Sequence, residues 1–217
     1  MKSNGLLIVI SGFSGAGKGT LMKRLIEDYD NYALSISMTT RAPRVGEADG
    51  REYFFTTREQ FESRIREDGF IEYASYCENY YGTPRDYVEA QMAAGKDVIL
   101  EIEIQGAMKI KEKYPDSVLL FVMPPSAETL YKRLTGRATE SREVILKRLK
   151  RAAEEAVGIE AYDYIVVNDD LEECVQALHS LLQETHDEIA EKYRTQNQIE
   201  FIEEVRKQLQ ELVKGEK

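Results

Sequence analysis

Short apolar runs alternate along the chain with segments in which apolar residues recur every three or four positions. The runs at residues 6–10, 97–104, 117–123 and 164–167 are rich in Val, Ile and Leu, which is typical of strands in a buried parallel sheet. Helical periodicity follows the first run and separates the others. Strands that alternate with helices in this order predict an α/β fold with a parallel core sheet flanked by helices.

Between residues 37 and 87 the apolar positions become short and aromatic. Thr57 and Gln60 fit a capping box at the start of a small helix, and residues 34–38 alternate as a strand that leads into this stretch. Pro84 is placed to open a helix at its end. We therefore expect a small α+β domain, residues 37–87, inserted into the α/β core.

Two helical segments remain outside these elements. Residues 126–158 form a basic helical pair that begins after two prolines, and residues 186–217 form a charged helical pattern with one apolar stripe. The stripe predicts either a helix laid back on its own core or a dimer contact, and consists of Ile189, Tyr193, Ile202, Val205, Leu209 and Leu212. The core is then expected to comprise residues 1–36, 88–125 and 159–217.

Composition narrows the class of protein. The chain has 217 residues, 42% of them hydrophobic, which is enough for a sizeable core in one or two domains. No apolar stretch approaches the roughly 20 residues of a membrane helix. Cys77 and Cys174 lack metal-ligand spacing, so we expect free thiols and a cytoplasmic location. The net charge of −10 argues against nucleic-acid binding, although a nucleotide substrate needs only a local positive site.

Residues 12–20, GFSGAGKGT, form a P-loop directly after the first apolar run. Its glycines permit a tight turn in which backbone N–H groups converge on an anion, and the following helix directs its positive end to the same point. Lys18 adds a positive charge for the β- and γ-phosphates. Because Gly19 replaces the usual Ser or Thr, we expect the hydroxyl nearest a metal to come from Thr20 or from water.

A second candidate site follows in the segment SMTTRAPRVGE, where Arg41 and Arg44 bracket a proline turn. Arginine recognises phosphate oxygens in a planar, bidentate way, and the hydroxyls of Ser37, Tyr53 and Tyr81 could add donors. The spacing alone fits a solvated basic loop equally well. The P-loop in the same chain favours a phosphate site, because phosphoryl transfer needs a second site that holds the acceptor.

Two carboxylates end the run LEIEIQG. Glu101 and Glu103 are alternate residues of the predicted strand 97–104, so we expect them to share a face at its C-terminal end, where open α/β sheets bind ligands. Because unpartnered buried carboxylates are unfavourable, a metal, a water shell or a base donor is expected nearby.

Three arginines lie in or beside the segment KRLTGRATES. Arg133 and Arg137 are four residues apart and would share one helical face, and Arg148 follows on the next helix. A solvated helix face accounts for the charge pattern. The alternative is a lid that closes over a nucleotide.

Taken together, these motifs resemble the guanylate kinase family, bacterial type, over residues 5 to about 185. The motifs, in chain order, are GFSGAGKGT, SMTTRAPRVGE, FIEYA, NYYGTP, LEIEIQG, MPPS, TGRATES and IVVNDD. The resemblance implies a P-loop nucleoside-monophosphate kinase fold, with residues 37–87 as a GMP-binding domain and residues 126–158 as a helical lid. It implies transfer of the γ-phosphoryl group of MgATP to GMP or dGMP, giving ADP and GDP, in purine nucleotide metabolism and GMP recycling.

The resemblance also implies roles by position. ATP would be held by the loop and by a residue beside the adenine: Gly12, Phe13, Ser14, Gly15, Ala16, Gly17, Lys18, Gly19, Thr20 and Asn168. GMP would be held by Ser37, Arg41, Arg44, Tyr53, Glu72, Tyr81, Thr83 and Glu103, with Glu72 and Thr83 reading the guanine edge. The catalytic charges would come from Lys18, Arg41, Arg133, Arg137 and Arg148, and Mg²⁺ would meet Thr20 and Glu101 through water.

Three positions depart from the family pattern. Phe13 replaces a proline and is expected to loosen the loop, Ala138 replaces a lid glycine, and Glu103 replaces the commoner Asp. Two other interpretations stay open. Another nucleoside-monophosphate kinase would share the loop and the arginines, although Glu72 and Thr83 argue against it. A guanylate-kinase-like scaffold module would bind peptides without catalysis, although such modules typically lose the functional P-loop. The expected partners are ATP and GMP, with no nucleic acid or membrane, in a monomer or homodimer.

Overall fold

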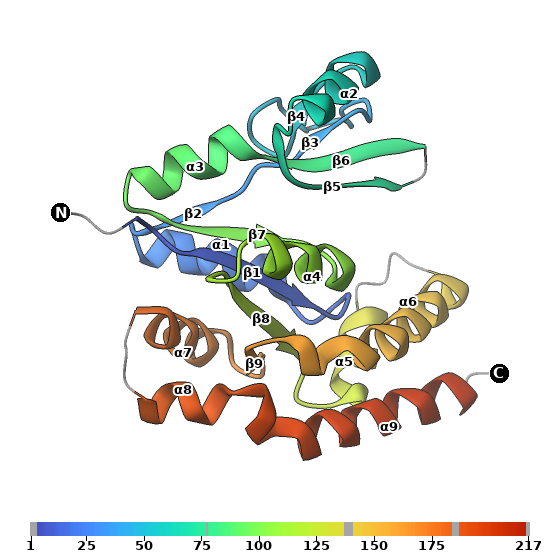
Figure 1. Ribbon diagram of the computed structural model, residues 1–217. Helices are drawn as coiled ribbons and strands as arrows, with labels where there is room; N and C mark the ends of the chain where they lie inside the picture. The colour runs from blue at the N-terminus through green and yellow to red at the C-terminus, as the bar shows by residue number, and fades with distance from the viewer. Residues whose placement is uncertain (1–3, 77, 137–140, 184–186, 216–217) are drawn as a thin grey trace. The chain divides into compact units, whose positions relative to one another are not determined.

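The computed structural model describes residues 4–76, 78–136, 141–183 and 187–215 (Figure 1). Its helices and strands follow each other in the order β1 Leu7–Gly12, α1 Lys18–Asp28, β2 Tyr32–Leu34, β3 Met38–Thr39, β4 Phe54–Phe55, α2 Arg58–Arg66, β5 Phe70–Tyr76, β6 Asn79–Pro84, α3 Arg85–Ala93, β7 Asp97–Glu101, α4 Ile104–Lys113, β8 Val118–Met123, α5 Ala127–Thr135, α6 Arg142–Glu155, the 3₁₀ helix η1 Ala156–Ala161, β9 Tyr164–Val167, α7 Leu171–Gln183, α8 Asp187–Tyr193, the 3₁₀ helix η2 Thr195–Gln198 and α9 Ile199–Gly215. The chain forms two compact units, unit 1 with Met1–Val9 and Tyr29–Val118, and unit 2 with Ile10–Asp28 and Leu119–Lys217.

The core sheet has the strand order β2-β7-β1-β8-β9, and the division between the units runs through β1 and β8. In unit 1, β2 pairs with β7 in parallel, and in unit 2, β8 pairs with β9 in parallel. Ile8, Val9 and Ile10 of β1 have no solvent exposure, as the apolar run predicted. The expected α/β fold with a parallel core sheet flanked by helices is confirmed.

Unit 1 contains a second sheet, with the strand order β4-β3-β6-β5. The predicted capping box is present on α2, since Gln60 N donates to Thr57 Oγ1 and Thr57 N donates to Gln60 Oε1, each at 3.3 Å. Phe61 of α2 is fully buried and stacks on Phe70 and Tyr80, with ring centroids 4.3 and 5.1 Å away. This stacking fixes α2 on the small sheet that carries one of the candidate sites.

Residues 34–38, predicted as one strand, belong to two sheets, so that prediction is wrong. β2 ends at Leu34 and β3 begins at Met38. The chain between them stays extended but changes partners: Ser35 N donates to Ile99 O of β7, whereas Ser37 O accepts from Phe54 N of β4. Alternating polarity reports extended backbone and says nothing about which neighbour completes the hydrogen bonds, which is why the pattern could not show the change of sheet.

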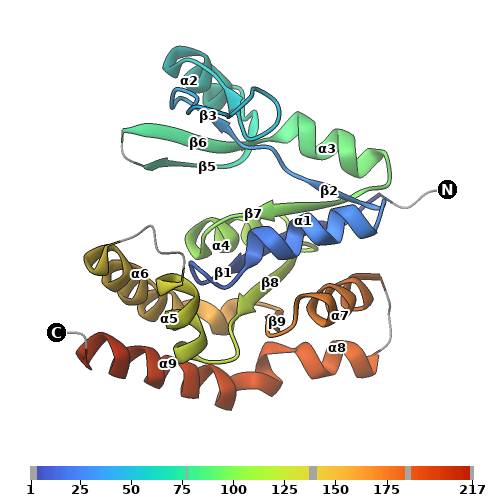
Figure 2. The same cartoon turned by 180° about the vertical axis from the view of Figure 1, so that it is seen from behind.

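The C-terminal helix α9 lies along α5 and α6 of unit 2 in both views (Figure 1, Figure 2). Ile202, Val205 and Leu209 of the apolar stripe are buried there, with at most 1% of their surface exposed. The interpretation of a helix laid back on its own core is therefore confirmed, whereas the side chain of Ile189 lies outside the described residues. Within the residues that the structure describes, none of the helices has both the length and the apolar character needed to span a bilayer.

Candidate active site

The predicted site residues form two clusters, one within each unit. The P-loop cluster of unit 2 comprises residues 12–20 with Arg133 and Asn168. The small-sheet cluster of unit 1 lies on the four-stranded sheet and comprises Ser37, Arg41, Tyr53, Glu72, Tyr81 and Thr83.

Among the P-loop glycines, Gly15 and Gly17 show most clearly how both conformation and space exclude a side chain. Gly15 and Gly17 have φ of +94° and +91°. A Cβ on Gly15 would lie 2.8 Å from Leu134 Cδ2, and one on Gly17 would lie 2.5 Å from Asn168 Nδ2. The helix α1 follows at once, with Leu21 N donating to Gly17 O at 3.0 Å. The loop N–H groups and the positive end of α1 thus meet at one point, which is the arrangement that binds phosphate.

Lys18 is the first residue of α1, and its ammonium lies over the start of the loop. Nζ donates to Gly12 O at 2.7 Å and to Phe13 O at 3.2 Å. Phe13 was expected to loosen the loop, but its ring is fully buried and packs edge-on against Phe121 at 5.2 Å. The aromatic replacement therefore anchors the loop in the core, where the family proline would have stiffened the backbone.

A pocket of about 470 Å³ opens beside this loop within unit 2. Five of its lining residues were predicted from the sequence and three were missed; the lining comprises Gly15, Gly17, Thr20, Arg133, Gly136, Asn168, Asp169 and Leu171. Asp169 directly follows Asn168 in the motif IVVNDD, so the motif itself carried the signal that was missed.

Asn168 and Arg133 both reach the P-loop backbone. Asn168 is buried, and its Nδ2 donates to Ala16 O at 2.8 Å. Arg133 of α5 lies 3.4 Å from Ala16 O through Nη1 and 3.4 Å from Asp169 O through Nη2, at the long limit of hydrogen bonding. Arg148 is half-buried on α6 and does not line the pocket, and Arg137 lies outside the described residues. Arg133 is thus the predicted lid arginine that the structure brings to the loop.

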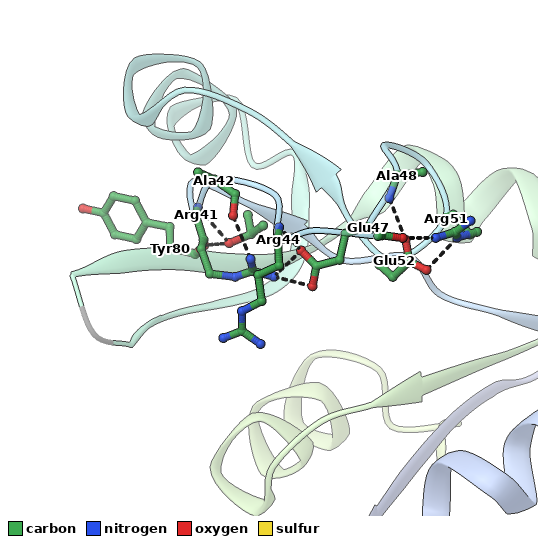
Figure 3. A network of polar contacts seen from close by, with 10 residues as sticks. Arg41, Ala42, Arg44, Glu47, Ala48, Arg51, Glu52 and Tyr80 are labelled. Atoms are coloured by element: carbon green, nitrogen blue, oxygen red, sulfur yellow. Dashed lines mark hydrogen bonds and ion pairs between the residues drawn. The ribbon is translucent and has the colours of Figure 1, made fainter.

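In the small-sheet cluster, Arg41 is held by a carboxylate that sequence reasoning did not assign. Arg41 Nη2 donates to both oxygens of Glu47, at 2.9 and 3.0 Å, and Glu47 Oε2 also accepts from Arg44 N at 2.7 Å (Figure 3). The side chains of Arg41 and Glu47 are only 15% and 17% exposed. The hydrogen bond from Arg41 lowers the pKa of Glu47, so the pair stays charged well below neutral pH. A glutamate three residues after Arg44 was the only available signal.

Aromatic rings complete the surroundings of Arg41. Its guanidinium carbon lies 5.4 Å from the centroid of Tyr53 and 5.9 Å from that of Phe55. Tyr53 packs edge-on against Tyr81 at 6.0 Å. The guanidinium of Arg44 points away from Glu47 in Figure 3 and makes no hydrogen bond or ion pair with the described part of the chain. Arg41 is therefore preset by Glu47, whereas the side chain of Arg44 extends from an exposed loop.

Glu72 and Thr83 meet on the neighbouring strands β5 and β6. Thr83 is fully buried and donates from Oγ1 to Glu72 Oε1 at 2.9 Å. Burial raises the pKa of Glu72, and the Thr83 hydrogen bond and the charge of Lys109 oppose that rise. Tyr81 and Thr83 are two residues apart on β6 and so share a face. The predicted phosphate-binding and base-reading residues of this cluster consequently lie on one side of the small sheet.

Glu101 and Glu103 do not share a strand, so the prediction of one strand over residues 97–104 is wrong. β7 ends at the exposed Glu101, and Glu103 is the N-cap residue of α4. An alternating E-I-E-I run fits the entry to a helix as well as a strand, and periodicity could not separate the two. A Cβ on Gly106 would lie 3.7 Å from Glu72 Oε2, so the first turn of α4, which Glu103 caps, faces the Glu72 carboxylate.

Comparison with known proteins assigns the family to which this geometry belongs. Residues 4–185 match the family model described as guanylate kinase. The chain belongs to the guanylate kinase family. The guanylate kinase of Caldanaerobacter subterraneus subsp. tengcongensis is 47% identical over 208 residues, covering 96% of this chain and 98% of that protein. The guanylate kinase of Desulfitobacterium hafniense is 50% identical over 193 residues, covering 89% and 94%.

A solved structure agrees with the sequence relatives. The crystal structure of guanylate kinase from Anaplasma phagocytophilum superposes with a TM-score of 0.65 at 36% identity, covering 85% of this chain and 89% of that one. The match of the family model ends at residue 185, before α8 and α9.

Proposed function

We propose that the two clusters divide the substrates of the guanylate kinase reaction, with ATP on the P-loop cluster and GMP on the small-sheet cluster. The reaction transfers the γ-phosphoryl group of ATP to GMP, giving ADP and GDP, in purine nucleotide metabolism and GMP recycling. The observation that carries the assignment of GMP is the Glu72–Thr83 pair, a carboxylate fixed in orientation by a buried hydroxyl 2.9 Å away. A fixed carboxylate suits the two adjacent donors that guanine presents, N1–H and the 2-amino group.

ATP is assigned to the unit that contains the glycine loop. The N–H groups of residues 12–20 surround the phosphates, and Lys18 supplies charge to the β- and γ-phosphates. Asn168 and Asp169 line the same pocket and lie by the adenine in this proposal. The hydrogen bond from Asn168 to Ala16 O adds a second task, since it holds the loop in its nucleotide-binding conformation.

GMP is assigned to the small sheet. Arg41, Arg44, Ser37, Tyr53 and Tyr81 hold its phosphate, with Arg41 preset by Glu47. Glu72 accepts from the guanine donors, and Glu103 at the start of α4 assists. The Thr83 hydroxyl has one proton and gives it to Glu72. Thr83 is therefore assigned to orient Glu72, while guanine O6 is left to the other donors of the site.

The chemical step requires no nucleophilic side chain. An oxygen of the GMP phosphate attacks the γ-phosphorus of ATP, and the protein contributes positioning and positive charge. Lys18 and Arg133 provide that charge from unit 2, and Arg137 and Arg148 of the proposed lid, residues 126–158, are assigned to the same task. Closure of the lid excludes water and so limits hydrolysis of ATP.

We assign to a magnesium ion carried by ATP the two oxygen ligands that the sequence predicted, Thr20 and Glu101. The hydroxyl of Thr20 in the first turn of α1 and the carboxylate of Glu101 at the end of β7 are both exposed. The described residues contain no cluster of three or more His, Cys, Asp or Glu side chains that could enclose a metal. Mg²⁺ typically retains waters and binds through substrate phosphates with one or two protein oxygens, so Thr20 and Glu101 would hold it through water. The ion would neutralise charge on the γ-phosphoryl group.

A coupled assay for ADP tests the proposal, with GMP, dGMP, AMP, CMP and UMP as acceptors. We expect ADP formation with GMP and dGMP, and a preference over AMP of about 10⁴-fold, because sites that hydrogen-bond a specific group reject analogues lacking it. Efficient use of AMP would indicate another nucleoside-monophosphate kinase. Absence of ADP formation with every one of these acceptors would favour a peptide-binding module. We further propose a cytoplasmic location for the enzyme, in keeping with its substrates.

A further inference from the structure

The helix α9 holds both ends of the segment that carries the proposed lid arginines. It lies beyond the residues matched by the family model. Its apolar stripe is buried within unit 2, but two polar side chains on it make more specific contacts. Gln208 reaches the first residue of α5, and Arg206 reaches the residue that follows α6.

The contact with α5 satisfies a backbone donor that the helix cannot satisfy itself. The first N–H groups of any helix lack intrahelical partners. In α5, Ser126 Oγ accepts from Thr129 N at 3.0 Å, and Gln208 Oε1 accepts from Ala127 N at 3.2 Å. Gln208 Nε2 donates to Glu204 Oε1 at 2.9 Å, which turns the amide oxygen toward α5. The start of α5 is thus capped partly by its own residue and partly by α9.

The contact with α6 is its counterpart at a helix C-terminus. Arg206 Nη2 donates to Ala156 O at 2.7 Å, where α6 ends and η1 begins. Arg206 also forms an ion pair with Glu160 of η1 and is only 24% exposed. A cation at this end complements the helix dipole, and its N–H group donates to a carbonyl that has no partner within the helix. Ala127 and Ala156 lie near the two limits of residues 126–158, so α9 ties the first and last turns of the proposed lid.

Both arginine-bearing helices start or end at these ties. Arg133 lies six residues beyond Ala127 on α5, and Arg148 lies eight residues before Ala156 on α6. Arg133 lies 3.4 Å from Ala16 O of the P-loop and 3.4 Å from Asp169 O beside it, so a small rotation of α5 about its first turn would break both contacts. We propose that Gln208 and Arg206 are positioning residues, which hold α5 and α6 so that their arginines address the ATP phosphates. This inference rests on the proposed function, because it assumes that these arginines act on the phosphoryl group.

The test replaces each tie with an apolar side chain of similar size and uses a neighbour on α9 as the control. Gln208→Met removes the acceptor, and Arg206→Met removes the donor. Gln210→Met makes the same replacement at an exposed position two residues further along the helix. We expect kcat to fall about threefold to tenfold in each tie variant, and by more in the double variant, while KM for GMP stays within about twofold. Gln210→Met should match the wild type.

Hydrogen exchange without nucleotide provides a readout independent of activity. Amides in the first turn of α5 should exchange faster in Gln208→Met, and those at the end of α6 should exchange faster in Arg206→Met, with unit 1 unchanged. Arg206→Lys, which keeps the positive charge, should recover part of both losses. This variant also serves as the test if Arg206→Met does not fold.

Unchanged kcat in the double variant would overturn the inference, as would an equal loss in Gln210→Met. A rise in kcat would overturn it as well, because α9 would then restrain the lid rather than position it. Failure of the proposed function looks different: the wild type would form no ADP with GMP, and the exchange data would be unaffected.

Discussion

The two clusters proposed to bind phosphate are built by different physical means. The P-loop cluster of unit 2 is built mainly from backbone, in which glycines with positive φ turn the N–H groups toward one point and a buried asparagine braces the carbonyl of Ala16. The small-sheet cluster of unit 1 is built from side chains on β5 and β6 and on the segments beside β3 and β4. Two of its charged side chains have a fixed partner, Arg41 in the Glu47 carboxylate and Glu72 in the Thr83 hydroxyl. In the proposed function, the first cluster would accept any nucleoside triphosphate, whereas the second would distinguish one base from another.

This difference predicts how each cluster responds to mutation. Backbone donors cannot be removed one at a time, so changes in unit 2 should affect turnover with every acceptor equally. Side chains in unit 1 can be removed singly, so changes there should separate affinity, selectivity and pH dependence. The assignment of ATP to unit 2 and GMP to unit 1 would be contradicted if changes in unit 2 altered the choice of acceptor, or if changes in unit 1 affected turnover with every acceptor equally.

The largest effect is expected from Lys18→Ala. Lys18 Nζ lies over the loop carbonyls of Gly12 and Phe13, where it can meet the β- and γ-phosphates. Turnover should fall about 10²- to 10³-fold, because a positioned charge on the transferring group is lost, while the Kd for GMP is unchanged. Steady-state kinetics and GMP titration measure the two. Lys23→Ala, at an exposed position of the same helix, is the matched control. Near-normal turnover in Lys18→Ala would contradict the P-loop assignment.

Glu72→Gln should lower activity with GMP and, at neutral pH, raise the stability of the folded protein. The amide can no longer accept from both guanine donors, so kcat/KM for GMP should fall about 10²-fold or more while KM for ATP is retained. Burial raises the pKa of Glu72, so ionising it in the folded protein is unfavourable relative to the unfolded chain. Stability therefore declines as the pH rises from the ordinary carboxyl range through the raised pKa, and a neutral amide avoids this decline.

We accordingly expect Glu72→Gln to melt at a higher temperature than the wild type at pH 7, with the difference shrinking in acid. Thermal melts at several pH values measure this, with Glu112→Gln, an exposed glutamate of unit 1, as the control. A lower melting temperature for Glu72→Gln at neutral pH would contradict the assigned effect of burial.

Glu47→Gln tests whether Arg41 is preset. The amide keeps one acceptor oxygen of the two that Arg41 and Arg44 N share and removes the negative charge beside Arg41, so the substrate itself must order Arg41. KM for GMP should rise about tenfold, with kcat within about threefold and rejection of AMP unchanged. Glu52→Gln is a close control, because Glu52 also pairs with an arginine and a backbone N–H but lies on the exposed Arg51 (Figure 3). Equal effects of the two variants would show that Glu47 acts only through loop stability.

The sequence predicted the P-loop cluster well because its chemistry depends on local spacing. Nine consecutive residues set the loop. The structure adds that Asn168 braces it, that Phe13 anchors it in the core, and that three unpredicted residues line its pocket: Gly136, Asp169 and Leu171. The small-sheet cluster was predicted residue by residue but without its internal pairing. Glu47 reaches Arg41, six residues away in the chain, only because of the conformation of the loop between them. Hydrophobic periodicity carries no information about the conformation of a loop.

The same reasoning explains the wrong element boundaries. Residues 34–38 and 100–104 alternate in polarity, yet the first segment changes sheets and the second enters a helix at Ile104. Alternation identifies extended backbone, and hydrogen-bond partners then decide where an element ends. The role of Glu103 beside the base came from family resemblance and not from strand periodicity. Glu103 lies at the start of α4, and its contact with the base stays a prediction.

The smallest effect, and the finest test of the comparison, is expected from Thr83→Val. The replacement keeps the volume of a fully buried side chain but removes the hydroxyl that donates to Glu72 Oε1. That hydrogen bond lowers the pKa of Glu72, so its loss should raise the pKa further. Guanine presents donors and needs the ionised carboxylate, so the acid limb of kcat/KM for GMP should move to higher pH, with KM for GMP at neutral pH rising about two- to fivefold.

Thr83→Ser retains the hydroxyl and should restore the wild-type pH profile. KM for ATP should not change in either variant, because the P-loop cluster belongs to unit 2. A pH profile of Thr83→Val that superposes on that of the wild type would mean that Thr83 does not set the charge of Glu72, and the orienting role would have to pass to the first turn of α4.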